Sequence, residues 1–138
     1  MALILCIETT TTNCSVALAK NGKVLALKED MGLNYSHAER LHVYIQDVLN
    51  ETGLDTKKLD AIAVSKGPGS YTGLRIGVSS AKGLSFSLNI PLLATNTLKA
   101  LAMQARTEDI KYVIPLLDAR RMEVYSAIYD NNFKEIRE

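Results

Sequence analysis

Short apolar runs alternate with amphipathic segments along this chain, and the alternation predicts an α/β fold. The dipeptide Asn21-Gly22 lies between two such runs and is typical of a two-residue hairpin turn. The chain is therefore expected to open with a three-stranded antiparallel unit. Strands are predicted at about residues 2–7, 15–19, 24–27 and 60–65.

The first helix is predicted by a capping box that precedes an apolar stripe. Ser36 and Glu39 have the spacing at which each side chain bonds the backbone N–H of the other residue. Gly53 marks the expected end of the helix. The stripe recurs at helical spacing and consists of Leu41, Tyr44, Ile45, Val48 and Leu49.

The middle of the chain completes one mixed sheet. A second helix is expected after strand 60–65 and a glycine-rich turn, and a short strand at 91–94 follows it. A last helix is predicted from about Thr97 to Arg106. The element order is β-β-β-α-β-α-β-α, with five strands in one mixed sheet.

A faint internal repeat relates the two ends of the chain. The apolar run 4–7 ends in Glu8, the run 114–117 ends in Asp118, and an asparagine turn lies thirteen residues beyond each acid. We therefore expect residues 1–108 to form one lobe and residues 109–138 to begin a similar second lobe that is incomplete in this chain. Glu8 and Asp118 are candidates for a paired-carboxylate or metal-water site. The alternative is that both acids cap strand ends or pair with neighbours such as Arg120.

The glycine-rich turn opens the segment 66–77, KGPGSYTGLRIG. Its glycines permit backbone conformations that other residues avoid, and Ser70 or Thr72 can cap the helix that follows. A helix start favours an anion, so Gly67, Pro68, Gly69 and Ser70 are candidates for contact with a phosphate or a nucleotide. The segment lacks the lysine of a phosphate-binding loop, and its glycine spacing misses the dinucleotide pattern by one residue. Turn formation alone therefore remains an alternative.

Small residues form a ridge on the second helix. Gly73, Gly77 and Ala81 are four residues apart, and Leu84 continues the same face. Such a ridge lets another helix approach closely. The neighbour is either a part of the same domain or a partner protein, and the pattern leaves both open.

Composition limits the function classes. The 138 residues are 47% hydrophobic with a net charge of +1, which predicts a globular chain without a dedicated nucleic-acid surface. Cys6 and Cys14 are expected to be free thiols in a reducing cytoplasm. No run is long enough to cross a bilayer, and the first residues lack a basic leader, so neither a membrane anchor nor a signal peptide is expected.

The remaining chemistry predicts no catalytic residue and no metal site. His37 and His42 are five residues apart and point about 140° away from each other on a helix, whereas ligand pairs lie three or four residues apart. No Gly-x-Ser-x-Gly elbow is present. His37 is instead expected at an interface or a helix cap.

Several segments together resemble the bacterial TsaB family. They are Ile7-Glu8-Thr9, Cys14–Leu18, Gly67–Gly77, and Leu117–Arg120 with Glu123-Val124-Tyr125. The resemblance implies an actin-like/Hsp70/sugar-kinase (ribonuclease H-like) fold. It also implies a non-catalytic scaffold that pairs with TsaD, and with the ATPase TsaE, to make threonylcarbamoyladenosine beside the tRNA anticodon.

The resemblance assigns roles to particular residues. The two central helices would form the surface for TsaD or for a homodimer, with ATP and metal used by the partner proteins and tRNA reached through the complex. This surface would comprise His37, Leu41, Tyr44, Ile45, Val48, Gly73, Gly77, Ser80, Ala81 and Leu84. The degenerate phosphate turns would be Glu8-Thr9 and Asp118 with Arg120; Glu8 stands where the family usually has aspartate. Two rivals share the fold, an ATP-dependent small-molecule kinase and a glycoprotease-like metallopeptidase.

Overall fold

The computed structural model describes residues 1–30, 37–105 and 109–137. Its main sheet has five strands in the order β3-β2-β1-β4-β5, in which β1, β4 and β5 are parallel and the pairs β1–β2 and β2–β3 are antiparallel. Positive φ at both Asn21 and Gly22 forms the predicted hairpin turn. The strands are β1 (Leu3–Glu8), β2 (Cys14–Lys20), β3 (Lys23–Asp30), β4 (Ala61–Ser65) and β5 (Leu92–Thr95).

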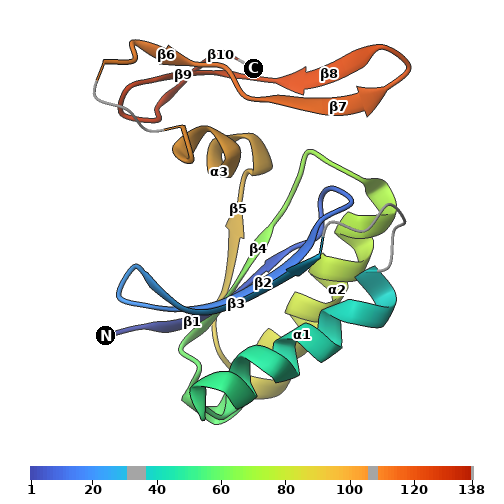
Figure 1. Ribbon diagram of the computed structural model, residues 1–138, viewed down its shortest axis with the longest axis vertical. Helices are drawn as coiled ribbons and strands as arrows, with labels where there is room; N and C mark the ends of the chain where they lie inside the picture. The colour runs from blue at the N-terminus through green and yellow to red at the C-terminus, as the bar shows by residue number, and fades with distance from the viewer. Residues whose placement is uncertain (31–36, 106–108, 138) are drawn as a thin grey trace.

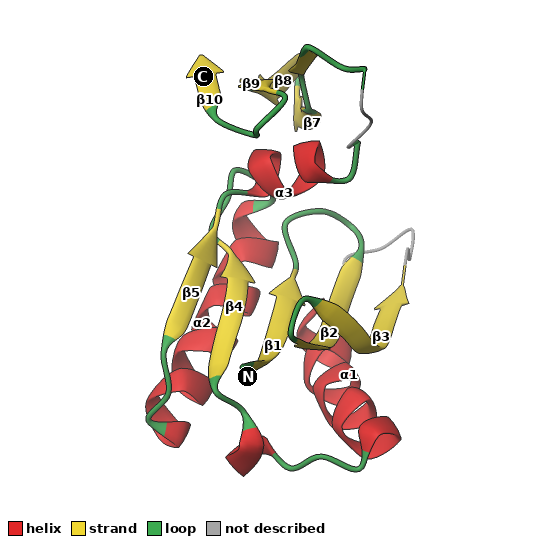
Figure 2. Cartoon of the chain, turned by 90° about the vertical axis from the view of Figure 1, so that its left-hand side faces the viewer, coloured by secondary structure: helices red, strands yellow, loops and turns green. Residues whose placement is uncertain are grey.

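Two long helices cover one face of this sheet (Figures 1 and 2). They are α1 (His37–Thr52) and α2 (Tyr71–Leu88). Right-handed crossovers explain the arrangement, because the steps from β3 to β4 and from β4 to β5 proceed in the same direction across the sheet. A short 3₁₀ turn (Thr56–Lys58), which the sequence pattern did not reveal, links α1 to β4.

The core lies between the sheet and these helices. Alternate residues of β1 are buried, as in Leu3, Leu5 and Ile7, while the residues between them are half-buried on the opposite face. Leu41 and Val48 of α1 are buried against this sheet. The burial pattern of the strand therefore shows that α1 and α2 cover one face of the sheet, whereas the other face is less buried.

A second β unit follows the helix α3 (Thr97–Met103), which lies between it and the main sheet (Figure 2). Its strands are β6 (Tyr112–Val113), β7 (Leu116–Arg120), β8 (Glu123–Ser126), β9 (Ile128–Asp130) and β10 (Glu135–Arg137). β7 pairs with β8, while β9 pairs with both β6 and β10. Leu98 and Ala102 of α3 pack with Ala127 and Tyr129 in a small separate core. The predicted second strand, 123–129, is divided into β8 and β9, which belong to separate sheets, so this unit does not repeat the antiparallel sheet of the first. The boundary at residue 108 stays a prediction.

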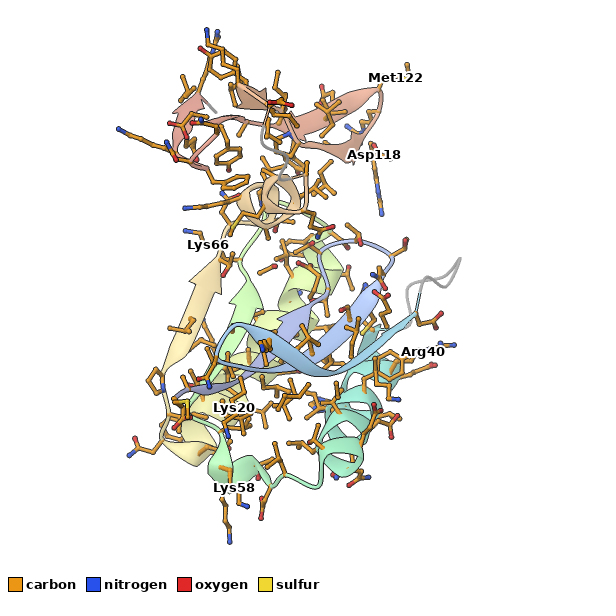
Figure 3. All side chains as sticks on the ribbon, turned by 60° about the vertical axis from the view of Figure 1, so that its left-hand side comes forward. Lys20, Arg40, Lys58, Lys66, Asp118 and Met122 are labelled. Atoms are coloured by element: carbon orange, nitrogen blue, oxygen red, sulfur yellow. The ribbon has the colours of Figure 1, made fainter. Side chains whose placement is uncertain are left out.

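The structure corrects two details of the repeat. β7 continues past Asp118 to Arg120, so Asp118 lies inside a strand and not at its end. The first unit has loop 9–13 at the corresponding place, whereas β7 and β8 are joined by a tight turn at Arg121 and Met122 (Figure 3). The predicted Ser36 cap lies outside the described residues. Helix α3 ends at Met103, three residues before the predicted end at Arg106.

Helix α2 lies very close to the loop that follows β1. A Cβ on Gly73 would stand 2.0 Å from the carbonyl oxygen of Thr9, and one on Gly77 would stand 2.1 Å from Thr9 Oγ1. That hydroxyl donates a 2.7 Å hydrogen bond to the Gly73 carbonyl. Ala81, the third residue of the ridge, is fully buried. The ridge therefore packs inside the domain, which is one of the two alternatives that the pattern left open, and its three residues do not form the partner surface that the resemblance implied.

The glycine contact predicts opposite effects for two substitutions in α2. Gly73→Ala is expected to lower the free energy of unfolding by at least about 2 kcal/mol, because a backbone oxygen cannot rotate away from the new methyl group. Gly83→Ala is the matched control, since nothing lies within 4 Å of its Cβ position, and it is expected to raise stability by about 0.5–1 kcal/mol. Equilibrium urea unfolding measures both; equal stability of the two variants would contradict the close approach.

Candidate functional site

The glycine-rich turn joins β4 to α2 and fits against the loop after β1. Gly67 has φ of 108°, a conformation that side chains disfavour. A Cβ on Gly69 would lie 2.6 Å from both Cβ and O of Thr10, and the Ser70 N–H donates to that oxygen at 2.7 Å. Ser70 Oγ accepts from the N–H of Gly73, so Ser70 is the helix cap and exposed Thr72 is not. These glycines serve an internal contact.

Residues 9–12, named here the threonine loop, connect this turn to β1. The Glu8 carboxylate accepts hydrogen bonds from the backbone N–H of Thr10 at 2.7 Å and from Thr10 Oγ1 at 2.5 Å. Its other oxygen accepts from Ser65 Oγ at the end of β4. Glu8 therefore ties together the ends of two neighbouring strands, which matches the interpretation of this acid as a strand-end cap.

The threonine loop also contacts α1. His37 Nε2 lies 2.7 Å from the carbonyl oxygen of Thr11, and His37 is 1% exposed. The first residue of α1 is thus held by the loop that packs on α2. His37 lies inside the domain and not at its surface.

The structure places most of the expected partner surface in the interior. Seven of its ten residues are buried: His37, Leu41, Ile45, Val48, Gly73, Gly77 and Ala81. Only Tyr44, Ser80 and Leu84 remain partly exposed. The physical reason is that the apolar and small faces of α1 and α2 are the faces that pack on their own sheet. That part of the prediction is wrong for these seven residues.

The outer face of the two helices carries a groove instead. It has a volume of about 440 Å³ and is lined by Ala38, His42, Thr72, Arg75, Ile76, Ser79 and Ser80. His42 Nε2 lies 3.4 Å from Ser80 Oγ, and the Arg75 guanidinium lies 5.6 Å above the Tyr71 ring. Sequence reasoning missed all of these except Ser80. The available signal was the row of small and polar residues that flanks the buried faces of α1 and α2.

Two aromatic side chains flank this face of α2. Tyr71 at its first turn is 75% exposed, and Phe86 near its last turn is 90% exposed. Val43 of α1 is exposed as well. Large exposed aromatics beside a groove of small residues are typical of protein-binding surfaces.

A second cavity, of about 420 Å³, separates the first lobe from the β7–β8 hairpin. Its walls are Thr10, Thr11, Thr12, Gly69, Ser70, Tyr71, Thr72, Leu117, Asp118, Ala119, Arg120 and Tyr125. Figure 3 labels Asp118 on the hairpin side. Gly67, Pro68 and Glu8 are not among these residues. The cavity therefore brings together parts of both repeats but not the two acids.

One carboxylate oxygen of Asp118 accepts a hydrogen bond from its own turn. Its Oδ1 accepts from the backbone N–H of Arg120 at 2.7 Å. The hydroxyl groups, the carboxylate and the guanidinium in this cavity can bind a polar ligand. The arrangement provides no paired-carboxylate site.

The described residues contain no group of three or more His, Cys, Asp or Glu side chains that could hold a metal ion. His37 faces the threonine loop whereas His42 faces Ser80, so the two rings diverge as predicted. Both cysteines are free, and burial raises the pKa of each thiol. In the same part of the chain, no helix is long and apolar enough to cross a membrane.

Known proteins resemble the chain along most of its length. The family model described as TsaD, tRNA N6-adenosine threonylcarbamoyltransferase, matches residues 33–138. The tRNA threonylcarbamoyladenosine biosynthesis protein TsaB of Bacillus subtilis is 39% identical over 91% of this chain and 54% of its own length. The chain thus spans about half the length of the curated relatives it matches.

Solved structures agree with this relationship. YeaZ from Pseudomonas aeruginosa superposes with a TM-score of 0.84 at 39% identity, over 94% of this chain and 60% of that one. The activator of 2-hydroxyisocaproyl-CoA dehydratase from Clostridium difficile, solved with ADPNP, has a TM-score of 0.56 at 16% identity over 99% of this chain and 43% of that one, which bears on the fold alone. The fold is the actin-like, sugar-kinase type expected from the sequence. The chain therefore belongs to the family represented by TsaD and, within it, to the TsaB proteins.

Proposed function

We propose that this chain is a scaffold subunit that binds TsaD and so supports threonylcarbamoyl transfer to the adenosine beside the tRNA anticodon. Its family membership supports the pathway. The single observation that supports docking is the exposed groove between α1 and α2, beside which the exposed Tyr71 ring lies under the guanidinium of the lining residue Arg75.

The chemistry of the groove suits a helix of the partner. Its floor consists of small side chains such as Ala38, Ser79 and Ser80, which allow close approach of a backbone. Arg75, stacked on Tyr71, offers a preoriented cation at the rim. A helix with small or apolar residues facing the floor and an acid facing Arg75 fits this surface.

An accessory role is also consistent with the acids of the two turns. The Glu8 carboxylate is engaged by Thr10 and Ser65, and Asp118 lies within a strand. On this proposal ATP and metal belong to the partner proteins, TsaE joins the complex, and tRNA is reached through it in the cytoplasm. A homodimer through the same groove is the alternative state of the free chain.

A bulky charge in the groove is expected to abolish docking. Ser79→Arg should weaken binding to purified TsaD at least about tenfold, because an arginine fills space that the partner backbone needs. The thermal midpoint should stay within about 2 °C, since Ser79 is exposed. Size-exclusion chromatography and calorimetry measure the pairing.

The matched control is Ser87→Arg, an exposed position two turns along the same helix that does not line the groove. It is expected to bind TsaD as the unmodified chain does. Equal binding by the two variants would rule out the groove, and absence of any complex between TsaD and the unmodified chain would rule out the scaffold itself.

The cavity between the first lobe and the β7–β8 hairpin favours one rival, a nucleotide-using kinase. If the chain is a scaffold, calorimetry with Mg-ATP is expected to show a dissociation constant weaker than about 1 mM. Micromolar binding that Arg120→Ala removes would instead support the kinase, because Arg120 is a cation in the wall of that cavity.

A further inference from the structure

The Glu8 carboxylate occupies a small binding site made by its own chain. Three donors converge on it: the N–H and the hydroxyl of Thr10, and the hydroxyl of Ser65. Ser65 is 57 residues away in sequence. This set of a loop N–H with neighbouring hydroxyl groups is the kind that binds a small anion.

We propose that Glu8 is a positioning residue whose carboxylate acts as an internal anion: it holds the threonine loop in place, and through that loop it positions the first turns of both α1 and α2. The carboxylate touches neither helix. Its effect on them passes through the backbone of residues 9–11.

The contacts along this path are all made by the threonine loop. Thr10 O accepts from the Ser70 N–H at 2.7 Å, immediately before α2. Thr9 Oγ1 bonds the Gly73 carbonyl, and Thr11 O lies 2.7 Å from His37 Nε2 at the start of α1. A shift of this loop therefore changes both helix starts together.

A carboxylate is needed because one side chain must satisfy donors from two directions. Ionised carboxylate oxygens accept several hydrogen bonds, and bonds to a charged group are stronger than neutral ones. A neutral side chain without acceptors would leave the Thr10 N–H and two hydroxyl groups without partners beside a half-buried position.

The Glu8 side chain can be removed by substitution, and a small anion can then bind in its place. Glu8 also lines a groove of about 200 Å³ on the face of the sheet opposite α1 and α2, together with Cys6, Ser15 and Thr95. Removing the side chain leaves the Ser65 hydroxyl in this groove and the two Thr10 donors at the place that the carboxylate occupied. A carboxylate as small as formate can enter it and accept the same hydrogen bonds.

The test is amide hydrogen exchange in the Glu8→Ala variant of the chain. Exchange at Ser70 and Gly73 is expected to accelerate at least about tenfold, since each lost hydrogen bond to a charged group is worth more than one tenfold step. Lys66 N–H, bonded to Thr95 O outside the loop, should be unchanged. Sodium formate at about 0.2 M is expected to restore slow exchange, and sodium chloride at the same ionic strength is not.

The control variant is Glu29→Ala, which removes a carboxylate from the same row of the sheet, because Glu8 pairs with Ser15 and Ser15 with Glu29. Among the described residues, Glu29 makes one exposed side-chain contact, 3.3 Å to Asn13, so normal exchange is expected. Glu8→Gln keeps an acceptor for Thr10 and should fall between the unmodified chain and Glu8→Ala.

Unchanged Ser70 and Gly73 exchange in Glu8→Ala would overturn the proposal, as would faster exchange that formate does not slow. If Glu8→Ala does not fold, formate-dependent recovery of its circular dichroism supports the proposal, and no recovery contradicts it. These outcomes need no partner, so they are independent of the proposed function. Only the added expectation of weaker TsaD binding by Glu8→Ala, rescued by formate, rests on it.

Discussion

The contact between the threonine loop and the first turns of α2 is the constraint on which the rest of the structure depends. Thr9 fills the space that Gly73 and Gly77 leave open, and Thr10 fills the space beside Gly69. Because β1 and β4 are neighbours in the sheet, this contact joins the ends of two strands to the helix that follows the second. A side chain at any of the three glycines would clash with Thr9 or Thr10 unless the loop or the helix moved.

This close packing decides which helix surfaces remain for other proteins. The small ridge of α2 and the apolar stripe of α1 are buried in the core. The exposed groove is therefore lined by other residues, such as His42, Thr72 and Ser79. Its shape follows from the spacing of the two helices, and the threonine loop sets that spacing at their first turns through His37 and Ser70. The packing of the threonine loop inside the domain therefore also sets the shape of the groove on the outer surface.

Local pattern was sufficient for most of the fold. Apolar runs and turn residues predicted all five strands of the main sheet to within a few residues, since strand and helix periods depend on neighbouring positions. The contacts of the candidate site were harder to predict from local pattern. Ser70 and Thr72 were both predicted as possible caps, and the structure selects Ser70. A ridge of small residues signals close approach without identifying the neighbour. The side chains that contact Glu8 and Gly77 come from distant segments.

The sequence by itself determined the order of elements, the hairpin at Asn21-Gly22 and, through several short segments including 67–77, the family. These depend on short-range periodicity and on a run of consecutive residues. Only the tertiary structure decided that the glycine ridge faces Thr9, that Thr10 and Ser65 donate hydrogen bonds to the Glu8 carboxylate, and that Asp118 lies inside a strand. The reason is that each of these facts depends on which atoms fill a space, and that is settled by packing between segments far apart in the chain.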